Sequence, residues 1–397
     1  MSSAGLSRRR AAGPSTSQTS MDDDGDTNRS TRRPTEQDSS SGGAASHAGS
    51  ALEGGRKIAF DPRDMDRDAD EEGKLGGKVP RLTLMEEVLL LGLKDKQGYL
   101  SFWNDNISYA LRGCILIELA LRRRIALVKD SNRSYQLITE RIVEVIDDRQ
   151  TGETILDEAL KMIKSQEHDR LGINSWVDLM SGETWNVMKI GYQLKQVRER
   201  LAKGLVDKGV LRTEKRNFLL FDMATHPVAD ARVKESIVTR AVSILTSTTS
   251  AIPPSALDVE GTQCRVLRAV CLVCAAYSAS VLDNAFGRLE YEEREAAFQR
   301  ADDILGEFAI WPFGAGAGDM GAGFGAGGAA GAEMEARKRR KRQAAIASGG
   351  SRMGQEGRAS VMGLLEGVRK EMRGQDDFGF ELIAGVLEVL SKLDSLL

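Results

Sequence analysis

Apolar residues recur at helical spacing through most of the chain after residue 80, but large apolar side chains are scarce before it. Between Leu6 and Phe60 the sequence is rich in Ser, Gly, Arg and Asp. Such a segment buries too little apolar surface to offset the entropy that is lost when its backbone is ordered. The pattern therefore predicts a disordered N-terminal arm over residues 1–80 and one folded domain over residues 81–397.

Helices dominate the predicted domain. Thr83, with Glu86 three residues later, forms a capping-box sequence that predicts a helix running toward Gly92. Apolar residues three and four apart predict further helices over about 106–124, from about 154, and over about 186–208, 270–286, 291–308 and 378–396. The expected fold class is mainly α: a single globular helical domain with short β-hairpins.

Two hairpins are expected where short apolar runs flank polar residues. The first would pair residues 124–128 with 135–138, and the second would pair residues 210–214 with 217–221. In the second, the apolar run Phe218–Phe221 lies beside basic residues. That composition fits a tip that contacts an anionic membrane, and it fits a buried strand equally well.

Residues 314–357 interrupt the helical pattern with a Gly/Ala tract and the basic run Arg337–Arg342. This composition predicts a flexible insertion within the domain. A G-x-G-x-x-G match from Gly316 to Gly321 lies inside it, but no strand precedes it and no helix follows it. We therefore interpret the match as chance repetition and not as a dinucleotide site.

The net charge is only −3, so an anionic partner has to be met by a local patch. Residues 193–216 contain eight Lys or Arg against three acidic residues. Lys195 and Arg198, three apart, would share one face of the predicted helix, where two cations can hold a phosphate. The same pattern also fits an ordinary solvated helix face, and it leaves a nucleic-acid-binding protein as an alternative.

Residues for catalysis are scarce. The chain has histidine only at positions 47, 168 and 226, which assembles neither a triad nor a zinc site. Four cysteines, Cys114, Cys264, Cys271 and Cys274, lie in apolar helical stretches, as expected of reduced, buried thiols in a cytosolic protein. We expect no enzyme activity and no cofactor. No apolar run approaches the roughly 18–20 residues needed to span a bilayer, and the N-terminus lacks a signal peptide, although its Ser and Arg content superficially suits a transit peptide.

Six stretches of the sequence resemble the Golgi phosphoprotein 3 family, which includes a fungal vacuolar-sorting homologue. They are LTLMEEVLLLGL (82–93), SFWND (101–105), LRGC (111–114), SGETWN (181–186), VRERLAK (197–203) and FLLFDM (218–223). The resemblance covers residues 80–312 and resumes in the last helix, and it leaves out the arm and the Gly/Ala insertion.

This resemblance implies a mostly helical domain with a protruding hydrophobic β-hairpin and a surface pocket for phosphatidylinositol 4-phosphate. The pocket residues of the family fall on Trp103, Arg112, Lys195 and Arg198. Position 195 is Arg in some members, and Lys keeps the charge but loses the bidentate fork.

The resemblance also implies partners. The implied function is a peripheral adaptor on the cytoplasmic face of Golgi membranes, with a cytosolic pool. It would retain glycosyltransferases by linking their cytosolic tails to coatomer vesicles in retrograde transport. One segment of the family is implicated in membrane contact and self-association, and it corresponds to the hairpin residues Phe218, Leu219, Leu220 and Phe221. A coatomer contact corresponds weakly to the arginine cluster Arg8, Arg9 and Arg10.

Two interpretations compete with the adaptor. The first is a nucleic-acid-binding protein, which the basic segment and the run Arg337–Arg342 suggest. It predicts affinity for plain DNA or RNA with a steep dependence on salt. The second is an enzyme acting on phosphoinositides, which would need an acid, a base or a nucleophile that the sequence pattern does not reveal.

Overall fold

The computed structural model describes residues 52–53, 56–57, 77–100, 105–131, 135–182, 187–218, 221–315, 352–375 and 377–393. The chain divides into two compact units, Met1–Asp61 and Pro62–Leu397. In the first unit, β1 (Leu52–Glu53) and β2 (Arg56–Lys57) pair as antiparallel strands. Most of the predicted arm, residues 1–80, lies outside the described residues. The helical domain belongs to the second unit.

Helices make up most of the second unit, which confirms the predicted mainly α fold class. Its α-helices are α2 (Leu84–Gly92), α3 (Asp105–Leu121), α4 (Thr154–Ser165), α5 (Ile173–Ser181), α6 (Val197–Asp207), α7 (Ala231–Thr246), α8 (Arg265–Ser278), α9 (Tyr291–Phe308), α11 (Arg352–Met372) and α12 (Asp377–Leu390). Short 3-10 helices are η2 (Ile138–Glu140), η3 (Glu167–Asp169), η4 (Val187–Tyr192), η5 (Pro254–Ala256) and η6 (Leu282–Ala285).

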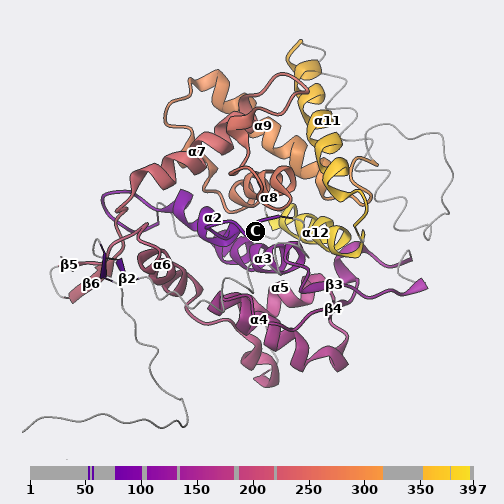
Figure 1. The fold of residues 1–397 in the computed structure, drawn as a ribbon, viewed down its shortest axis with the longest axis horizontal. Helices are drawn as coiled ribbons and strands as arrows, with labels where there is room; N and C mark the ends of the chain where they lie inside the picture. Colours follow the sequence, from indigo (N-terminus) through magenta and orange to yellow (C-terminus); the bar gives the residue numbers. More distant parts are fainter. Residues whose placement is uncertain are drawn as a thin grey trace, which may run out of the picture. The chain divides into compact units, whose positions relative to one another are not determined.

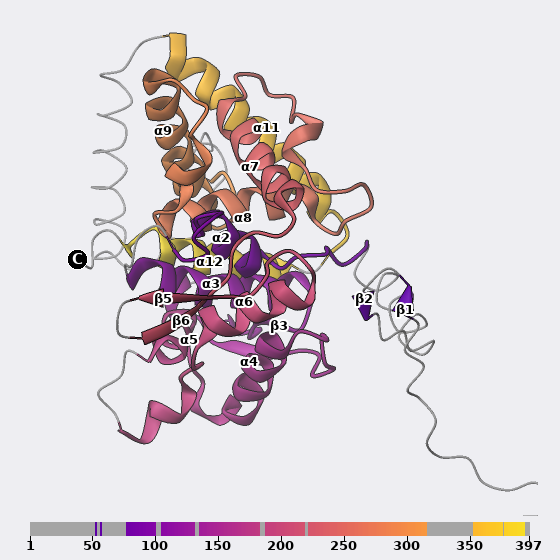
Figure 2. The ribbon, with the colours of Figure 1, turned by 90° about the vertical axis from the view of Figure 1, so that its left-hand side faces the viewer.

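The hydrophobic core is built around α3, which lies at the centre with α2, α8 and α12 packed against it (Figure 1). The side chains of Leu111 and Ile115 on α3 are completely buried. Gly113 lets α12 approach closely, because a Cβ at this position would lie 3.1 Å from Leu390. On one side of this centre lie α7, α9 and α11, and on the other lie α4 and α5 (Figures 1 and 2).

The N-terminus of α2 confirms the predicted capping box. The main-chain N–H of Thr83 donates to Glu86 Oε2 at 2.8 Å, and the Thr83 hydroxyl accepts from the N–H of Glu86 at 3.4 Å. The whole helix is buried, including Glu86 and Glu87. Both carboxylates therefore need partners inside the protein, and Lys208 and Arg240 supply them.

The first predicted hairpin has a different second strand. β3 (Ile125–Leu127) pairs antiparallel with β4 (Val143–Val145), so the expected pairing with residues 135–138 is wrong. Ile138 instead begins η2, which packs against α5 and α12. The alternating residues of β4 suit a half-buried strand as well as residues 135–138 do, so the local pattern could not distinguish the two.

The second hairpin lies about four residues further along than predicted from the pattern. β5 (Glu214–Phe218) pairs with β6 (Phe221–Thr225), and Phe218 opposes Phe221 at the last position of the register. Val210 and Leu211, which were expected in the first strand, are buried and bond back to the carbonyl of Leu205. Each strand has the other as its main neighbour among the described elements, and the hairpin lies at the edge of the helices, beside α6 (Figures 1 and 2).

The single helix predicted over residues 186–208 is wrong, because the segment forms η4, a bend and then α6. Gln196 sits at the bend with a φ of 52°, in the left-handed region. Leu194, just before it, is completely buried and bonds to the carbonyl of Met180 at 3.1 Å. Burial of Leu194 thus outweighs continuation of the helix. Gly209 ends α6 with a φ of 72°, as its sequence position predicts.

Two further outcomes concern the later part of the domain. α9 coincides with the predicted helix over residues 291–308, and α12 largely coincides with the one predicted over 378–396. Residues 316–351 of the predicted insertion lie outside the described residues, but α11 begins at Arg352, inside the range expected to be flexible.

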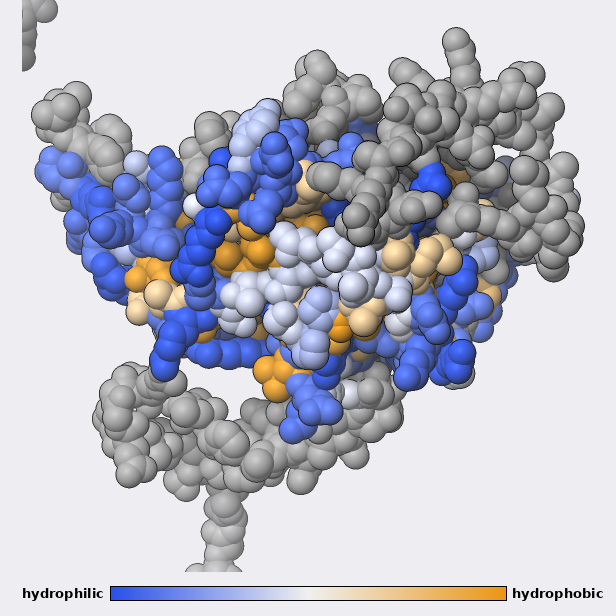
Figure 3. All heavy atoms as spheres, turned by 90° about the horizontal axis from the view of Figure 1, so that it is seen from above, coloured by the Kyte–Doolittle hydropathy of each residue, from blue (hydrophilic) through white to orange (hydrophobic). Residues whose placement is uncertain are grey.

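The face seen from above combines hydrophilic areas with smaller apolar ones (Figure 3). Isolated exposed apolar residues are ordinary in proteins, and only a cluster of them indicates a binding surface. None of the helices in the described part of the chain is both long and apolar enough to cross a bilayer.

Candidate anion-binding site

Arg112 of α3 ties together two segments that lie far apart in the sequence. Only 6% of the residue is exposed. Its Nε donates to the main-chain oxygen of Met180 at 3.2 Å, and Nη2 donates to that of Leu194 at 2.9 Å. Nη1 donates to the carbonyl and the hydroxyl of Ser108 at 3.2 and 2.9 Å. The guanidinium therefore fixes the end of α5 and the segment between η4 and α6.

The positive charge of Arg112 has only neutral oxygens as hydrogen-bond partners among the described residues. Among the described residues its partners are three main-chain carbonyls and one hydroxyl, and no carboxylate forms an ion pair with it. Burial, and then repulsion from Arg198, lowers the pKa of Arg112 to about 10. A buried cation without a counter-ion is unfavourable. An anion bound beside Arg112 would relieve that cost.

Arg198 supplies the second cation. It lies in the first turn of α6 and is half-buried, and burial lowers its pKa while Glu199 opposes that shift. Its charge acts on the guanidinium of Arg112. Two neighbouring cations repel each other unless an anion is held near both. This pair therefore suits a phosphate group better than it suits water alone.

Lys195 is exposed and lies before α6, on the far side of the bend at Gln196. The expectation that Lys195 and Arg198 share one helical face is therefore wrong. The two cations instead flank the N-terminus of α6, which has no side-chain cap. The N–H groups of an uncapped first turn and the helix dipole favour an anion at the same place.

The other predicted site residues are described only in part. Phe218 and Phe221 are described as paired main-chain positions at the end of the β5–β6 hairpin. Six of the predicted site residues lie outside the described residues. They are Trp103, Leu219, Leu220, Arg8, Arg9 and Arg10. The coatomer contact expected at that cluster therefore stays a prediction. The structure places Arg112 against the main chain of Leu194, directly before Lys195 in the sequence, and the charge of Arg198 acts on Arg112.

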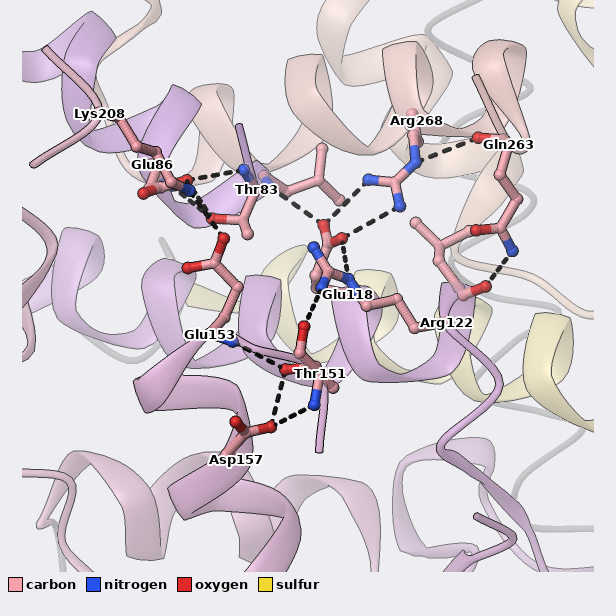
Figure 4. A network of polar contacts seen from close by, with 12 residues as sticks. Thr83, Glu86, Glu118, Arg122, Thr151, Glu153, Asp157, Lys208, Gln263 and Arg268 are labelled. Carbon is pink, nitrogen blue, oxygen red and sulfur yellow. Dashed lines mark hydrogen bonds and ion pairs between the residues drawn. The ribbon is translucent and has the colours of Figure 1, made fainter. Parts of the chain in front are cut away.

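α6 is held in place at its C-terminal end by Lys208. Its ammonium lies 2.8 Å from Glu86 Oε2 and 2.7 Å from Glu153 Oε1 (Figure 4). Burial raises the pKa of Glu86, and the charge of Lys208 opposes that shift. Lys208 therefore joins α6 to the capped start of α2 and to the start of α4.

A second buried ion cluster holds α3 against α8. Glu118 is completely buried, and its two oxygens accept from Arg268 at 2.9 and 3.0 Å and from Arg122 at 2.9 Å (Figure 4). Burial alone would raise the pKa of Glu118, but the two guanidinium groups lower it to about 2. This cluster fixes α3, the helix that carries Arg112.

Sequence reasoning missed the groups that orient Arg112. The carbonyls of Met180 and Leu194 belong to the main chain, and every residue has one. The residue types at these positions therefore do not indicate the contact. Ser108 is one helical turn before Arg112, and this i, i+4 spacing is the one signal that pointed to a contact.

The described residues also line a pocket of about 320 Å³, but it lies at the C-terminal end of α3. Ala120 and Leu121 line it together with residues from β3, β4 and α12. The predicted site is therefore separate from this pocket. In the described part of the chain, no group of His, Cys, Asp or Glu side chains could hold a metal ion, and the four cysteines are free and buried as predicted.

The described structure is a mainly helical domain with Lys195 and Arg198 at the uncapped start of α6 and a β-hairpin beside that helix. The sequence profile of Golgi phosphoprotein 3 (GPP34) matches residues 84–319. The chain belongs to this family.

Two relatives carry the name vacuolar protein sorting-associated protein 74. That of Schizosaccharomyces pombe is 54% identical over 314 residues, which cover 78% of this chain and 86% of the relative. That of Eremothecium gossypii is 54% identical over 259 residues, which cover 65% of this chain and 75% of the relative. The similarity therefore extends over most of the chain.

Proposed function

We propose that this protein is a non-enzymatic, peripheral adaptor of Golgi membranes that binds phosphatidylinositol 4-phosphate. Membership of the Golgi phosphoprotein 3 family and similarity to proteins named for vacuolar sorting support a role in Golgi trafficking. Arg112, Lys195 and Arg198 bind the 4-phosphate, and Trp103 lies against the bilayer interface.

The observation that carries this proposal is the buried guanidinium of Arg112, which has only neutral oxygens as partners among the described residues and on which the charge of Arg198 acts. A phosphate monoester carries a charge of about −1.5 to −2 at neutral pH, and it can accept hydrogen bonds from several donors at once. The uncapped start of α6 adds main-chain donors at the same place.

Two cations of the basic segment pair with carboxylates of other elements. Arg200 pairs with Glu158 at 2.5 Å, and Lys208 pairs with Glu86 and Glu153. These pairs neutralise part of the positive charge along α6, so the basic segment is not an uninterrupted stripe. A nucleic-acid backbone needs such a stripe, whereas a single phosphate headgroup does not.

The adaptor role extends to further partners. The protein captures cytosolic tails of Golgi glycosyltransferases and links them to coatomer vesicles, so that these enzymes are retained by retrograde transport. The hairpin residues Phe218–Phe221 support membrane contact and self-association, and coatomer is contacted by Arg8, Arg9 and Arg10. These assignments rest on family membership.

The test is co-sedimentation with vesicles that contain phosphatidylinositol 4-phosphate, compared with vesicles of matched charge that contain phosphatidylserine. We expect the native chain to prefer the phosphoinositide and the Lys195→Ala, Arg198→Ala variant to lose that preference. Lys203→Ala is the matched control, because Lys203 is an exposed cation on the same helix. Equal binding of both vesicle types by the native chain would refute the proposal, and salt-sensitive binding of plain DNA or RNA would favour the nucleic-acid alternative.

A further inference from the structure

η4, directly before the candidate site, presents three large apolar side chains to solvent. Val187 is 77% exposed, Met188 is 87% exposed and Ile190 is 47% exposed. They lie within four consecutive residues, and the two most exposed are adjacent. Most other strongly exposed apolar residues in the described part of the chain, such as Val259, occur singly, and Tyr135 and Leu137 form a smaller pair. A cluster of this kind marks a binding surface, whereas single residues do not.

Contacts at its C-terminal end fix η4 to the rest of the domain. The ring of Tyr192 packs edge-on against buried Trp176, with 6.3 Å between the ring centroids. The N–H of Gln193 bonds to the carbonyl of Ile190 at 3.2 Å, and the next residue is Leu194, whose carbonyl accepts from Arg112. The apolar side chains are thus displayed on a short helix whose C-terminal end is fixed by the core and by the candidate site. They need no unfolding to become accessible.

The charges around η4 indicate the kind of partner. From Val187 to Lys203 the chain carries five Lys or Arg and a single acidic residue. Lys189 lies within the apolar cluster, and Lys195 and Arg198 follow it closely. Apolar side chains rimmed by cations are the pattern of a surface that enters the interface of an anionic membrane. An apolar protein groove would not require this excess of positive charge.

We propose that Val187, Met188 and Ile190 form an apolar wedge that enters the bilayer while the adjacent cations bind the headgroup. This inference rests on the proposed membrane function. It adds a second contribution to membrane affinity, one that does not depend on the headgroup. The wedge acts through apolar burial, so it strengthens binding to every anionic vesicle by the same factor. The cations at residues 195 and 198 determine which headgroup is preferred.

The first experiment places a reporter on the wedge. All four native cysteines are buried, so Met188→Cys introduces an exposed thiol that a polarity-sensitive fluorophore can label selectively. Vesicles containing phosphatidylinositol 4-phosphate should increase the emission and shift it to the blue. Val259→Cys is the matched control, because Val259 is 75% exposed and lies in the segment between η5 and α8. Its label should not respond.

The second experiment removes the wedge. Met188→Ser, Ile190→Ser should weaken binding to phosphoinositide and phosphatidylserine vesicles alike, by at least tenfold, which corresponds to about 1.4 kcal/mol. The ratio between the two affinities should stay unchanged. Val259→Ser should change neither affinity.

The two proposals fail in different ways. If the protein sediments with phosphoinositide vesicles but the label at position 188 stays silent, the wedge is refuted while the headgroup assignment stands. If the label responds equally to both vesicle types and the native chain shows no headgroup preference, the wedge is supported and the headgroup assignment is refuted. If the serine variant binds every vesicle as tightly as the native chain, the wedge is refuted.

Discussion

Arg112 Nη2 donates a hydrogen bond of 2.9 Å to the main-chain carbonyl of Leu194, 82 residues later in the chain. Through this contact a buried side chain of α3 sets the position of the bend before α6. Burial, and then the charge of Arg198, lowers the pKa of the same guanidinium. Arg112 thus contributes both to the shape and to the charge of the candidate site, and substitutions can separate the two contributions.

Arg112→Lys keeps a positive charge but removes the planar fork that reaches Met180 and Leu194. We expect the free energy of unfolding to fall by about 1–3 kcal/mol, because buried carbonyls lose their donors. Urea denaturation measures this change, and vesicle sedimentation should show a weakened phosphoinositide preference. Arg123→Lys, at an exposed position near the other end of α3, serves as the control. Unchanged stability of the Arg112 variant would show that the hydrogen bonds from Arg112 to Met180 and Leu194 do not stabilise the site.

Glu118→Gln removes the carboxylate that two buried guanidinium groups share. Arg268 and Arg122 would then lack their counter-charge inside the core. We expect a loss of about 3–5 kcal/mol of unfolding free energy, since breaking a buried ion pair leaves an uncompensated charge. Thermal or urea unfolding at neutral pH measures it. Glu388→Gln, which removes the acid of an i, i+4 pair with partly exposed Lys392, should cost much less.

The pH dependence of stability offers an independent check on Glu118. Its pKa in the folded protein is about 2, below the ordinary value of 4.5. The native state therefore holds the carboxylate ionised, and this stabilisation is fully present above pH 4.5 and is lost as the pH falls toward 2. The shift corresponds to about 3 kcal/mol. Urea midpoints measured between these pH values should fall more steeply for the native chain than for Glu118→Gln, and parallel curves would contradict the assignment.

The sequence predicts those parts of the fold that depend on local patterns. The capping box at Thr83 and Glu86, the helix from Tyr291 to Phe308 and the stop at Gly209 are each encoded within a few residues, and the structure confirms them. The partner of β3 is different. Residues 143–145 pair with β3, whereas Ile138 begins η2, which packs against α12. No local pattern tells which of the two segments takes which place.

The candidate site divides in the same way. The residue types at positions 112, 195 and 198 were identified by resemblance, and the basic composition around the last two was visible in the sequence. Their arrangement was not, because the bend at Gln196 replaces a continuous helix. Leu194, two residues before the bend, is completely buried and its N–H bonds to the carbonyl of Met180 near the end of α5, and burial is a property of the whole fold.

The β5–β6 hairpin provides a test of self-association. Phe218→Ser, Phe221→Ser removes two large apolar side chains from the closing pair of the hairpin. Each aromatic of this kind contributes about 1.5–3 kcal/mol when it is buried in a contact, so the double variant should reduce association on vesicles by more than tenfold. Cross-linking of vesicle-bound protein measures the effect. Asn217→Ser, in the same strand, should leave the cross-linked fraction unchanged, and an equal fraction in the phenylalanine variant would exclude the hairpin as the contact.

The four cysteines should be chemically silent until the domain opens. Burial raises the pKa of Cys264 to about 11 and raises those of Cys114, Cys271 and Cys274 above the usual thiol range. The thiolate is the reactive form, so a thiol reagent at pH 8 has neither access nor a nucleophile. We expect slow modification of the folded chain, at a rate that follows opening of the core, and rapid modification of all four thiols in urea. Cys264, the most exposed at 8%, should react first, and Cys264→Ala should remove that first phase. A rapid reaction of the native chain that persists in this variant would show that the core around α8 opens more readily than its packing implies.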